Sequence, residues 1–110
     1  MSKIKKGGLV IMVYVVAKNF VKEGKTREFL KLAKQLEKAT NEKDEGCIKY
    51  ILVRNRDNPN VFAFIEEWTS QEALDAHIAA AHSKEIGAKL VDLLEKPGEA
   101  SFFTDIGEIN

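Results

Sequence analysis

The chain has 110 residues, which suits one domain with a single hydrophobic core. Lysine plus arginine and aspartate plus glutamate each total 17, so the formal net charge is zero and a nucleic-acid partner is not expected. The single cysteine, Cys47, excludes an internal disulfide, and one cysteine with two histidines is a poor supply for a structural zinc site. We therefore predict one cytoplasmic domain over residues 1–110, with residues 1–8 as a flexible N-terminal tail.

The first predicted element is a strand over residues 9–20. Both of its alternating residue sets are apolar, as in a strand that is covered on both faces. The stretch follows Lys3, Lys5 and Lys6, as the apolar region of a signal peptide follows its basic start. It is short and rich in β-branched residues, however, which favours a strand. No other apolar run approaches the length of a membrane span, so no membrane association is expected.

An amphipathic helix is predicted next, after a turn at residues 21–24. Apolar residues and one threonine recur there at helical spacing, while lysine and arginine face away. The inward positions are Phe29, Leu30, Ala33, Leu36 and Thr40. Gly46 interrupts this pattern. Two strands follow, over residues 47–54 and 61–69, and the turn residues between them predict a hairpin.

The rest of the chain predicts a helical region and a last strand. Thr69 followed by Glu72 has the spacing of a capping box, which starts a helix. The inward face of this helix is predicted to hold Ala73, Leu74, His77, Ile78 and Ala81. After a weak break at residues 82–83, a further helical segment is predicted, with Ile86, Leu90, Val91 and Leu94 inward. Pro97-Gly98 ends it before a final strand over residues 100–106.

This order of elements is that of the ferredoxin-like split β-α-β-β-α-β fold, an α+β arrangement with an antiparallel sheet and helices on one face. The helices then leave the other face of the sheet bare. Because the first and third strands are apolar on both sides, a second copy of the chain is the expected cover. We predict a homodimer through the sheet face, whose two sheets close into a dimeric α/β barrel. A monomer with an exposed apolar sheet is the alternative.

Glu66 and Trp68 are candidate functional residues of the third strand. With Phe62 and Phe64 they share one face, so that Glu66 lies between two aromatic side chains. A carboxylate there either finds a hydrogen-bond donor or has its pKa raised by desolvation. It can serve a function, or it can be a buried structural group that orients a helix end or an arginine. Trp68 can likewise be the wall of a pocket or a plain core residue.

His77 lies on the inward stripe of the next helix, within reach of Trp68 if that helix folds over the sheet. Its near-neutral pKa suits proton transfer, although a lone histidine on an apolar helical face is more often a core residue. His82, five residues later, can cap a helix, line a pocket entrance or be exposed. Neither G-x-G-x-x-G nor the complete phosphate-binding pattern G-x-x-x-x-G-K-[ST] occurs, so no nucleotide or flavin site is expected. These residues predict a small apolar pocket and, by themselves, name no reaction.

Several stretches of the chain resemble the antibiotic biosynthesis monooxygenase (ABM) family. The most specific is Glu66-x-Trp68 followed by Ala73-Leu74-x-x-His77 and then His82. The others are Tyr14-Val15-Val16-Ala17, Lys22-Glu23-Gly24 and Glu45-Gly46-Cys47-Ile48-Lys49-Tyr50. The resemblance extends over about residues 9–106.

This resemblance implies a dimeric α+β barrel with a pocket between the sheet and the helices of each subunit. The family includes cofactor-independent quinol and anthrone oxygenases, haem-degrading enzymes and an enzyme that processes a signal molecule. In an oxygenase without a cofactor, the deprotonated substrate supplies the electron to dioxygen, and the protein supplies a dry pocket, a base and stabilisation of the anion. By position, His77 is expected to accept the proton or stabilise the anion, Trp68 to line the substrate and Glu66 to orient a partner.

Two branches of the family match this chain less well. The anthrone-oxidising branch has Asn and Tyr where this chain has Phe64 and Leu74, which argues against an anthrone substrate. The haem-degrading branch has an Asn where this chain has Ala17, and Asn19 can replace it only in part; no histidine near residue 90 matches its axial ligand. Phe64, Leu74, Asn19 and His82 are expected to line the substrate pocket.

The expected function is therefore that of a quinol-monooxygenase-like enzyme. It would oxidise a small aromatic quinol or phenol with dioxygen, and no metal, flavin or other cofactor is expected. Two alternatives stay open. One is a non-catalytic or stress-related dimer that binds an apolar ligand, and the other is an isomerase or lyase that acts on a small carbonyl compound.

Overall fold

The structure is a computed structural model that describes residues 4–5, 8–9 and 11–106. Its strands are β1 (Ile4–Lys5), β2 (Gly8–Leu9), β3 (Val13–Phe20), β4 (Cys47–Arg54), β5 (Val61–Trp68) and β6 (Glu99–Thr104). Its helices are α1 (Thr26–Lys43), α2 (Gln71–Ala79) and α3 (Ala81–Val91). Among the described residues, no helix has the length and apolarity that a membrane span requires.

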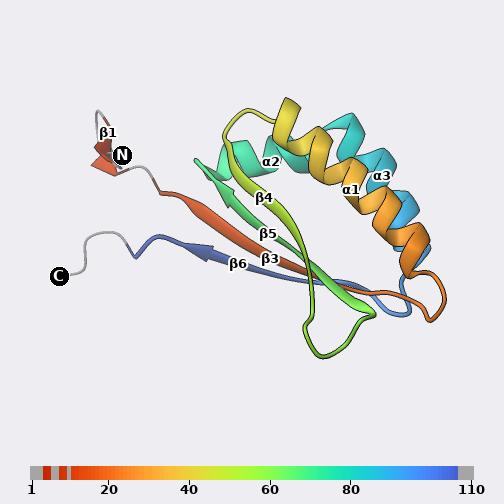
Figure 1. Ribbon diagram of the computed structural model, residues 1–110. Helices are drawn as coiled ribbons and strands as arrows, with labels where there is room; N and C mark the ends of the chain where they lie inside the picture. Colours follow the sequence, from red (N-terminus) through yellow and green to blue (C-terminus); the bar gives the residue numbers. More distant parts are fainter. Residues whose placement is uncertain (1–3, 6–7, 10, 107–110) are drawn as a thin grey trace.

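Four strands form one antiparallel sheet in the order β4-β5-β3-β6. All three helices cover the same face of this sheet (Figure 1). The predicted ferredoxin-like α+β fold is thus confirmed, with the second helical region in two pieces. The predicted tail over residues 1–8 lies mostly outside the described residues, and residues 4–5 and 8 belong to the separate pair β1 and β2.

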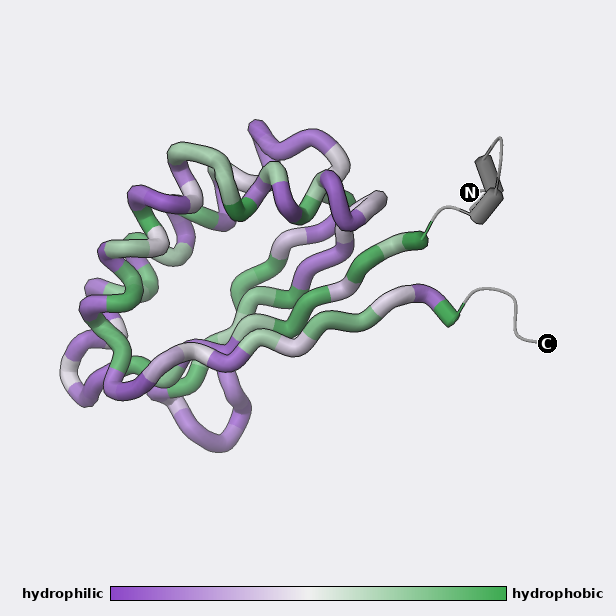
Figure 2. The backbone as a smooth tube through the Cα atoms, turned by 180° about the vertical axis from the view of Figure 1, so that it is seen from behind, coloured by the Kyte–Doolittle hydropathy of each residue, from purple (hydrophilic) through white to green (hydrophobic). Residues whose placement is uncertain are grey.

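The hydrophobic core lies between the helices and the inward face of the sheet. The predicted inward face of α1 is confirmed, because Phe29, Ala33, Leu36 and Thr40 are buried. Burial alternates along β5 as the pleat requires, and Phe62 packs on Phe29 with ring centroids 5.1 Å apart. Figure 2 shows hydrophobic residues along the central strands, whereas the helical layer mixes hydrophobic and hydrophilic residues. The periodicity of the sequence therefore translates directly into the core.

Two predicted boundaries are corrected by the structure. The first long strand begins at Val13 rather than at residue 9. The helix after β5 is capped by Ser70 and not by Thr69: the Ser70 hydroxyl oxygen accepts the backbone N–H of Ala73 at 3.0 Å. Serine caps a helix as well as threonine does, so the two adjacent residues compete and the backbone geometry decides.

The break in the second helical region also differs from the prediction. It falls at Ala80, whose ψ of 145° ends α2, so that His82 and Ser83 lie in the first turn of α3. Because α3 does not continue α2, a different set of its residues faces the core. Val91, which was predicted to face inward, is 64% exposed. Leu93, just beyond the end of α3, is buried in its place.

The face of the sheet opposite the helices is largely apolar and is left bare by the described residues. Cross-strand partners share a face, so the register places Ile65 between Val16 of β3 and Ile51 of β4. By the same register the apolar residues of this bare sheet face are Tyr14, Val16, Phe20, Ile51, Val53, Val61, Ala63, Ile65 and Phe103. Monomers rarely leave a contiguous patch of this kind uncovered. The homodimer through this face stays a prediction.

Gly46, between α1 and β4, has a left-handed backbone with φ of 83° and touches the start of α2. A Cβ there would lie 2.5 Å from Cβ of Ala73 and 2.7 Å from Oγ1 of Thr69. We expect Gly46→Ala to lower the free energy of unfolding by about 2–5 kcal/mol through backbone strain and overpacking. Gly24→Ala is the matched control, because Gly24 has the same φ and no atom within 4 Å; its expected loss is about 1–2 kcal/mol. Urea denaturation measures both losses. If the two variants lost the same free energy of unfolding, the contacts of the added Cβ with Ala73 and Thr69 would contribute nothing.

Candidate active site

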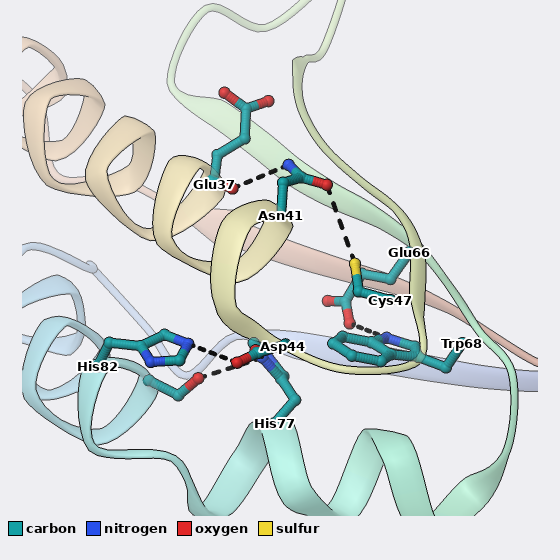
Figure 3. Close-up of polar contacts among 9 residues, drawn as sticks. Glu37, Asn41, Asp44, Cys47, Glu66, Trp68, His77 and His82 are labelled. Carbon is teal, nitrogen blue, oxygen red and sulfur yellow. Dashed lines mark hydrogen bonds and ion pairs between the residues drawn. The ribbon is translucent and has the colours of Figure 1, made fainter.

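Trp68 ends β5 with its side chain completely buried beneath the helices. Its Nε1–H donates a hydrogen bond to Oε1 of Glu66 over 2.9 Å (Figure 3). The two residues are two positions apart on the strand, so the pleat directs both toward the helices. Burial raises the pKa of Glu66 to about 7, and the hydrogen bond from Trp68 opposes this only in part. Glu66 thus combines both features expected of a carboxylate among aromatic residues.

The replacement Glu66→Gln is expected to remove a loss of stability that the wild type shows as the pH rises. The folded protein holds the Glu66 proton up to about pH 7, while an unfolded glutamic acid releases it near pH ~4.3. Between these values the folded state binds more protons, so the free energy of unfolding falls with rising pH by up to about 4 kcal/mol. Glutamine keeps an acceptor for Trp68 and does not titrate.

Urea denaturation of the wild type and Glu66→Gln at several pH values measures this effect. The difference between the two proteins carries the result, because the other titrating groups cancel. We expect the free energy of unfolding of Glu66→Gln to rise relative to that of the wild type as the pH rises toward 8. A difference that stays constant over the series would show that Glu66 does not hold its proton in the folded protein.

His77 projects from α2 onto the aromatic surface of the sheet. Its ring centroid is 4.7 Å from that of Trp68 and 5.2 Å from that of Tyr50. The helix α2 therefore folds over the sheet, which was the condition for His77 to reach Trp68. His77 is 7% exposed and Trp68 is not exposed at all. In this arrangement the indole of Trp68 packs against the His77 ring and restricts its orientation.

Asp44 is the functional residue that sequence reasoning missed. It ends α1, and its carboxylate oxygen Oδ2 lies 2.5 Å from Nδ1 of His77 (Figure 3). The two residues are 33 positions apart in the sequence. The only signal was its position, since Asp44 directly precedes the stretch Glu45–Tyr50 that carries the family resemblance, and no periodicity directs its side chain toward His77.

The electrostatics of this pair favour a neutral imidazole. Burial lowers the pKa of His77, and this outweighs the opposing effect of the Asp44 hydrogen bond and charge. The carboxylate accepts the Nδ1–H, an assignment made from the contact. The lone pair of the ring is then on Nε2, where the ring can accept a proton.

His82 and Ser83 complete the group from the first turn of α3. His82 Nε2 lies 2.9 Å from Oδ1 of Asp44, so the carboxylate is held between two imidazoles. Ser83 Oγ lies 3.2 Å from Nδ1 of His77. Side-chain exposure is 8% for Asp44 and 16% for His82. The structure therefore brings together Glu66, Trp68, His77 and His82, with Asp44 added.

The other predicted pocket residues lie at different distances from this group. Phe64 is buried and packs on Tyr50 with ring centroids 5.0 Å apart, and Leu74 is buried one helical turn before His77. Asn19 lies farther along β3, opposite Phe62, and its amide donates to the Ala17 carbonyl oxygen. No contact among the described residues joins Asn19 to the histidines.

Two surface cavities are formed by other parts of the molecule. One of about 390 Å³ is lined by Val91, Leu94, Lys96, Pro97 and Gly98. The other, of about 290 Å³, is lined by Phe20, Val21, Asn58, Asn60, Val61, Glu95 and Lys96. Neither lining includes a residue of the group around His77.

Comparison with known proteins adds the family. The model of the family described as antibiotic biosynthesis monooxygenase (ABM) matches residues 12–89. No protein of curated function matches the chain in sequence. Among solved structures, a conserved protein from Methanosarcina mazei is 39% identical, with 86% of this chain and 92% of that chain covered and a TM-score of 0.81.

Two further structures are of proteins named for the same family. A candidate antibiotic biosynthesis monooxygenase from Caulobacter crescentus is 25% identical, with 88% of this chain and 92% of that chain covered and a TM-score of 0.84. An antibiotic biosynthesis monooxygenase is 26% identical, with 86% of this chain and 98% of that chain covered and a TM-score of 0.80. The family match runs from just before β3 to the last turn of α3 and contains Asp44 and both histidines. The resemblance seen in the sequence is thereby confirmed, and this chain belongs to the antibiotic biosynthesis monooxygenase family.

Proposed function

We propose that the protein is a monooxygenase that oxidises a small aromatic quinol or phenol with dioxygen, without a redox cofactor. The observation that carries this proposal is the Asp44–His77 pair, which holds a neutral imidazole against the Trp68 ring in a nearly dry setting. Membership of the family supports the reaction class. A base in a dry site is what a cofactor-independent oxidation of a phenol requires of the protein.

The chemistry begins with proton transfer. His77 Nε2 takes the proton of a substrate hydroxyl, and the Asp44 carboxylate stabilises the imidazolium that results. The quinolate is electron-rich enough to reduce dioxygen. One oxygen atom then enters the ring and the other leaves as water, and the quinol, which becomes a hydroxyquinone, supplies all the electrons. Glu66 takes no proton from the substrate in this scheme: it fixes the Trp68 indole that supports His77.

Oxygen uptake with a panel of reduced benzoquinones and naphthoquinones tests the proposal. The wild type is expected to accelerate uptake beyond the autoxidation of each quinol, with one labelled atom from ¹⁸O₂ in the product. His77→Gln is expected to lose this acceleration, and Ile78→Gln, a neighbour that is 54% exposed on the same helix, to keep it. No acceleration with any quinol would overturn the proposal and favour the ligand-binding alternative.

A homodimer through the bare sheet face belongs to this proposal. The face offers contiguous apolar residues on β3, β4 and β5, with the Lys49–Glu67 ion pair of 3.5 Å at one end of the same face. A second copy of the same face is the partner that would bury this surface with a closed two-fold symmetry. The small aromatic substrate would then bind on the other side of the sheet, beneath the helices of each subunit.

A further inference from the structure

Three side chains of metal-binding type converge where α1, α2 and α3 meet. Asp44, His77 and His82 each offer one ligand atom, and these atoms lie within 4.8 Å of one another. Two imidazoles and one carboxylate form the donor set of catalytic zinc sites and of non-haem iron sites. We propose that these three residues bind one divalent first-row transition metal ion per chain, with Zn²⁺ as the reference ion. Counting histidines and cysteines in the sequence overlooked the site because its third ligand is Asp44.

The hydrogen bonds among these residues leave part of their polar groups unused. His82 Nε2 is buried and lies 2.9 Å from Oδ1 of Asp44, yet it is not oriented to form a hydrogen bond. Two oxygen atoms, from Asp44 and Ser83, face Nδ1 of His77, although a ring nitrogen carries at most one proton. An ion among the three side chains would use the lone pairs of both imidazoles and of the carboxylate. The need for such a partner is the second observation behind the proposal.

The surroundings fit an ion without a change of the backbone. Zinc binds imidazole nitrogen and carboxylate oxygen at about 2.0–2.2 Å, so the side chains would have to rotate modestly to enclose it. The backbone of Asp44 is fixed, since its N–H donates to the Thr40 carbonyl oxygen at 3.1 Å and its carbonyl accepts the Cys47 N–H at 3.2 Å. Three protein ligands leave a fourth position, which water or the Ser83 hydroxyl can fill.

An ion on Nδ1 of His77 has a consequence for the proposed oxidation. The ring proton must then be on Nε2, so His77 cannot accept a proton from a substrate. Metal binding and proton transfer would be mutually exclusive states of one site, and the ion would act as an inhibitor. This consequence rests on the proposed function, whereas the binding itself does not.

Calorimetric titration of the full-length, untagged and chelator-treated protein with ZnCl₂ tests the binding. We expect one ion per chain, and visible absorption bands of a low-symmetry complex when CoCl₂ replaces zinc. Asp44→Asn and His82→Ala are expected to weaken zinc binding at least ~10-fold, since the first removes the negative charge of a ligand and the second removes an imidazole ligand. His82 is 16% exposed, so its truncation leaves the core intact. Anaerobic competition between Zn²⁺ and Fe²⁺ tells which ion the site prefers.

Two control variants make the result specific. Glu45→Gln changes the exposed carboxylate next to Asp44, and Cys47→Ser removes the single thiol of the chain. Both are expected to bind zinc with wild-type affinity. The chain has two histidines, and both lie in the cluster, so an imidazole signature can come from nowhere else. Absence of binding, or wild-type affinity in Asp44→Asn and His82→Ala, would overturn the proposal whatever the oxygen-uptake assay gives.

Discussion

The wild-type chain is expected to sediment as a dimer, at twice the 12.3 kDa of one chain, and the Ile65→Lys variant as a monomer. Ile65 lies on the bare sheet face with Val16 on one side and Ile51 on the other. A lysine there would place an ammonium group from each subunit in a buried interface without a counter-charge. The desolvation cost of two such groups, several kcal/mol each, exceeds what the remaining apolar contacts can offset.

The matched control is Ile78→Lys. Ile78 is 54% exposed on α2, on the other side of the molecule from the bare sheet face, and the chemical change is the same. This variant is expected to remain a dimer with the sedimentation of the wild type. Both proteins are compared by analytical ultracentrifugation at micromolar concentration. A monomeric wild type, or a dimer that tolerates Ile65→Lys, would show that the bare sheet face is not the interface.

The hairpin of β4 and β5 was predictable because the residues of the turn between the two strands fix its conformation locally. The side-chain oxygen of Asn55 accepts the backbone N–H groups of Asp57 and Asn58, so the turn is built by residues that the sequence displays side by side. The break at Ala80 has no such signal. Alanine is the best helix former, and only the packing of α3 against α1 can end α2 at that residue. Tertiary contacts, invisible to local pattern, therefore decide the phase of α3.

The candidate site divides in the same way. Glu66, Trp68 and His77 follow from the period of a strand and of a helix, each of which assigns a side chain to the inward face. Asp44 ends a helix at a position where the period no longer applies, and its partner is 33 residues away. The complete burial of Trp68 could not be predicted from the sequence either, because it depends on how closely His77 and Tyr50 approach its ring.

Asp44→Asn is expected to lower the rate of quinol oxidation by about 10²–10⁴-fold, the range that general acid–base catalysis contributes. Asparagine has the shape of aspartate, but its amide can donate a hydrogen bond to Nδ1 of His77. The ring proton would then move to Nε2, and His77 would present a donor where the substrate needs an acceptor. The imidazolium would also lose its neighbouring negative charge. The change should therefore reduce kcat while KM stays near the wild-type value.

Glu45→Gln is the matched control for this variant, because Glu45 is the next residue and its side chain is exposed. We expect it to keep the wild-type rate. Thermal unfolding of all three proteins separates a catalytic loss from a folding defect, since Asp44→Asn should remain folded at the assay temperature. If folded Asp44→Asn oxidises quinols within about threefold of the wild type, well short of the 10²–10⁴-fold range of acid–base catalysis, the Asp44–His77 pair is not the base. Proton transfer would then have to be sought at another group of this site.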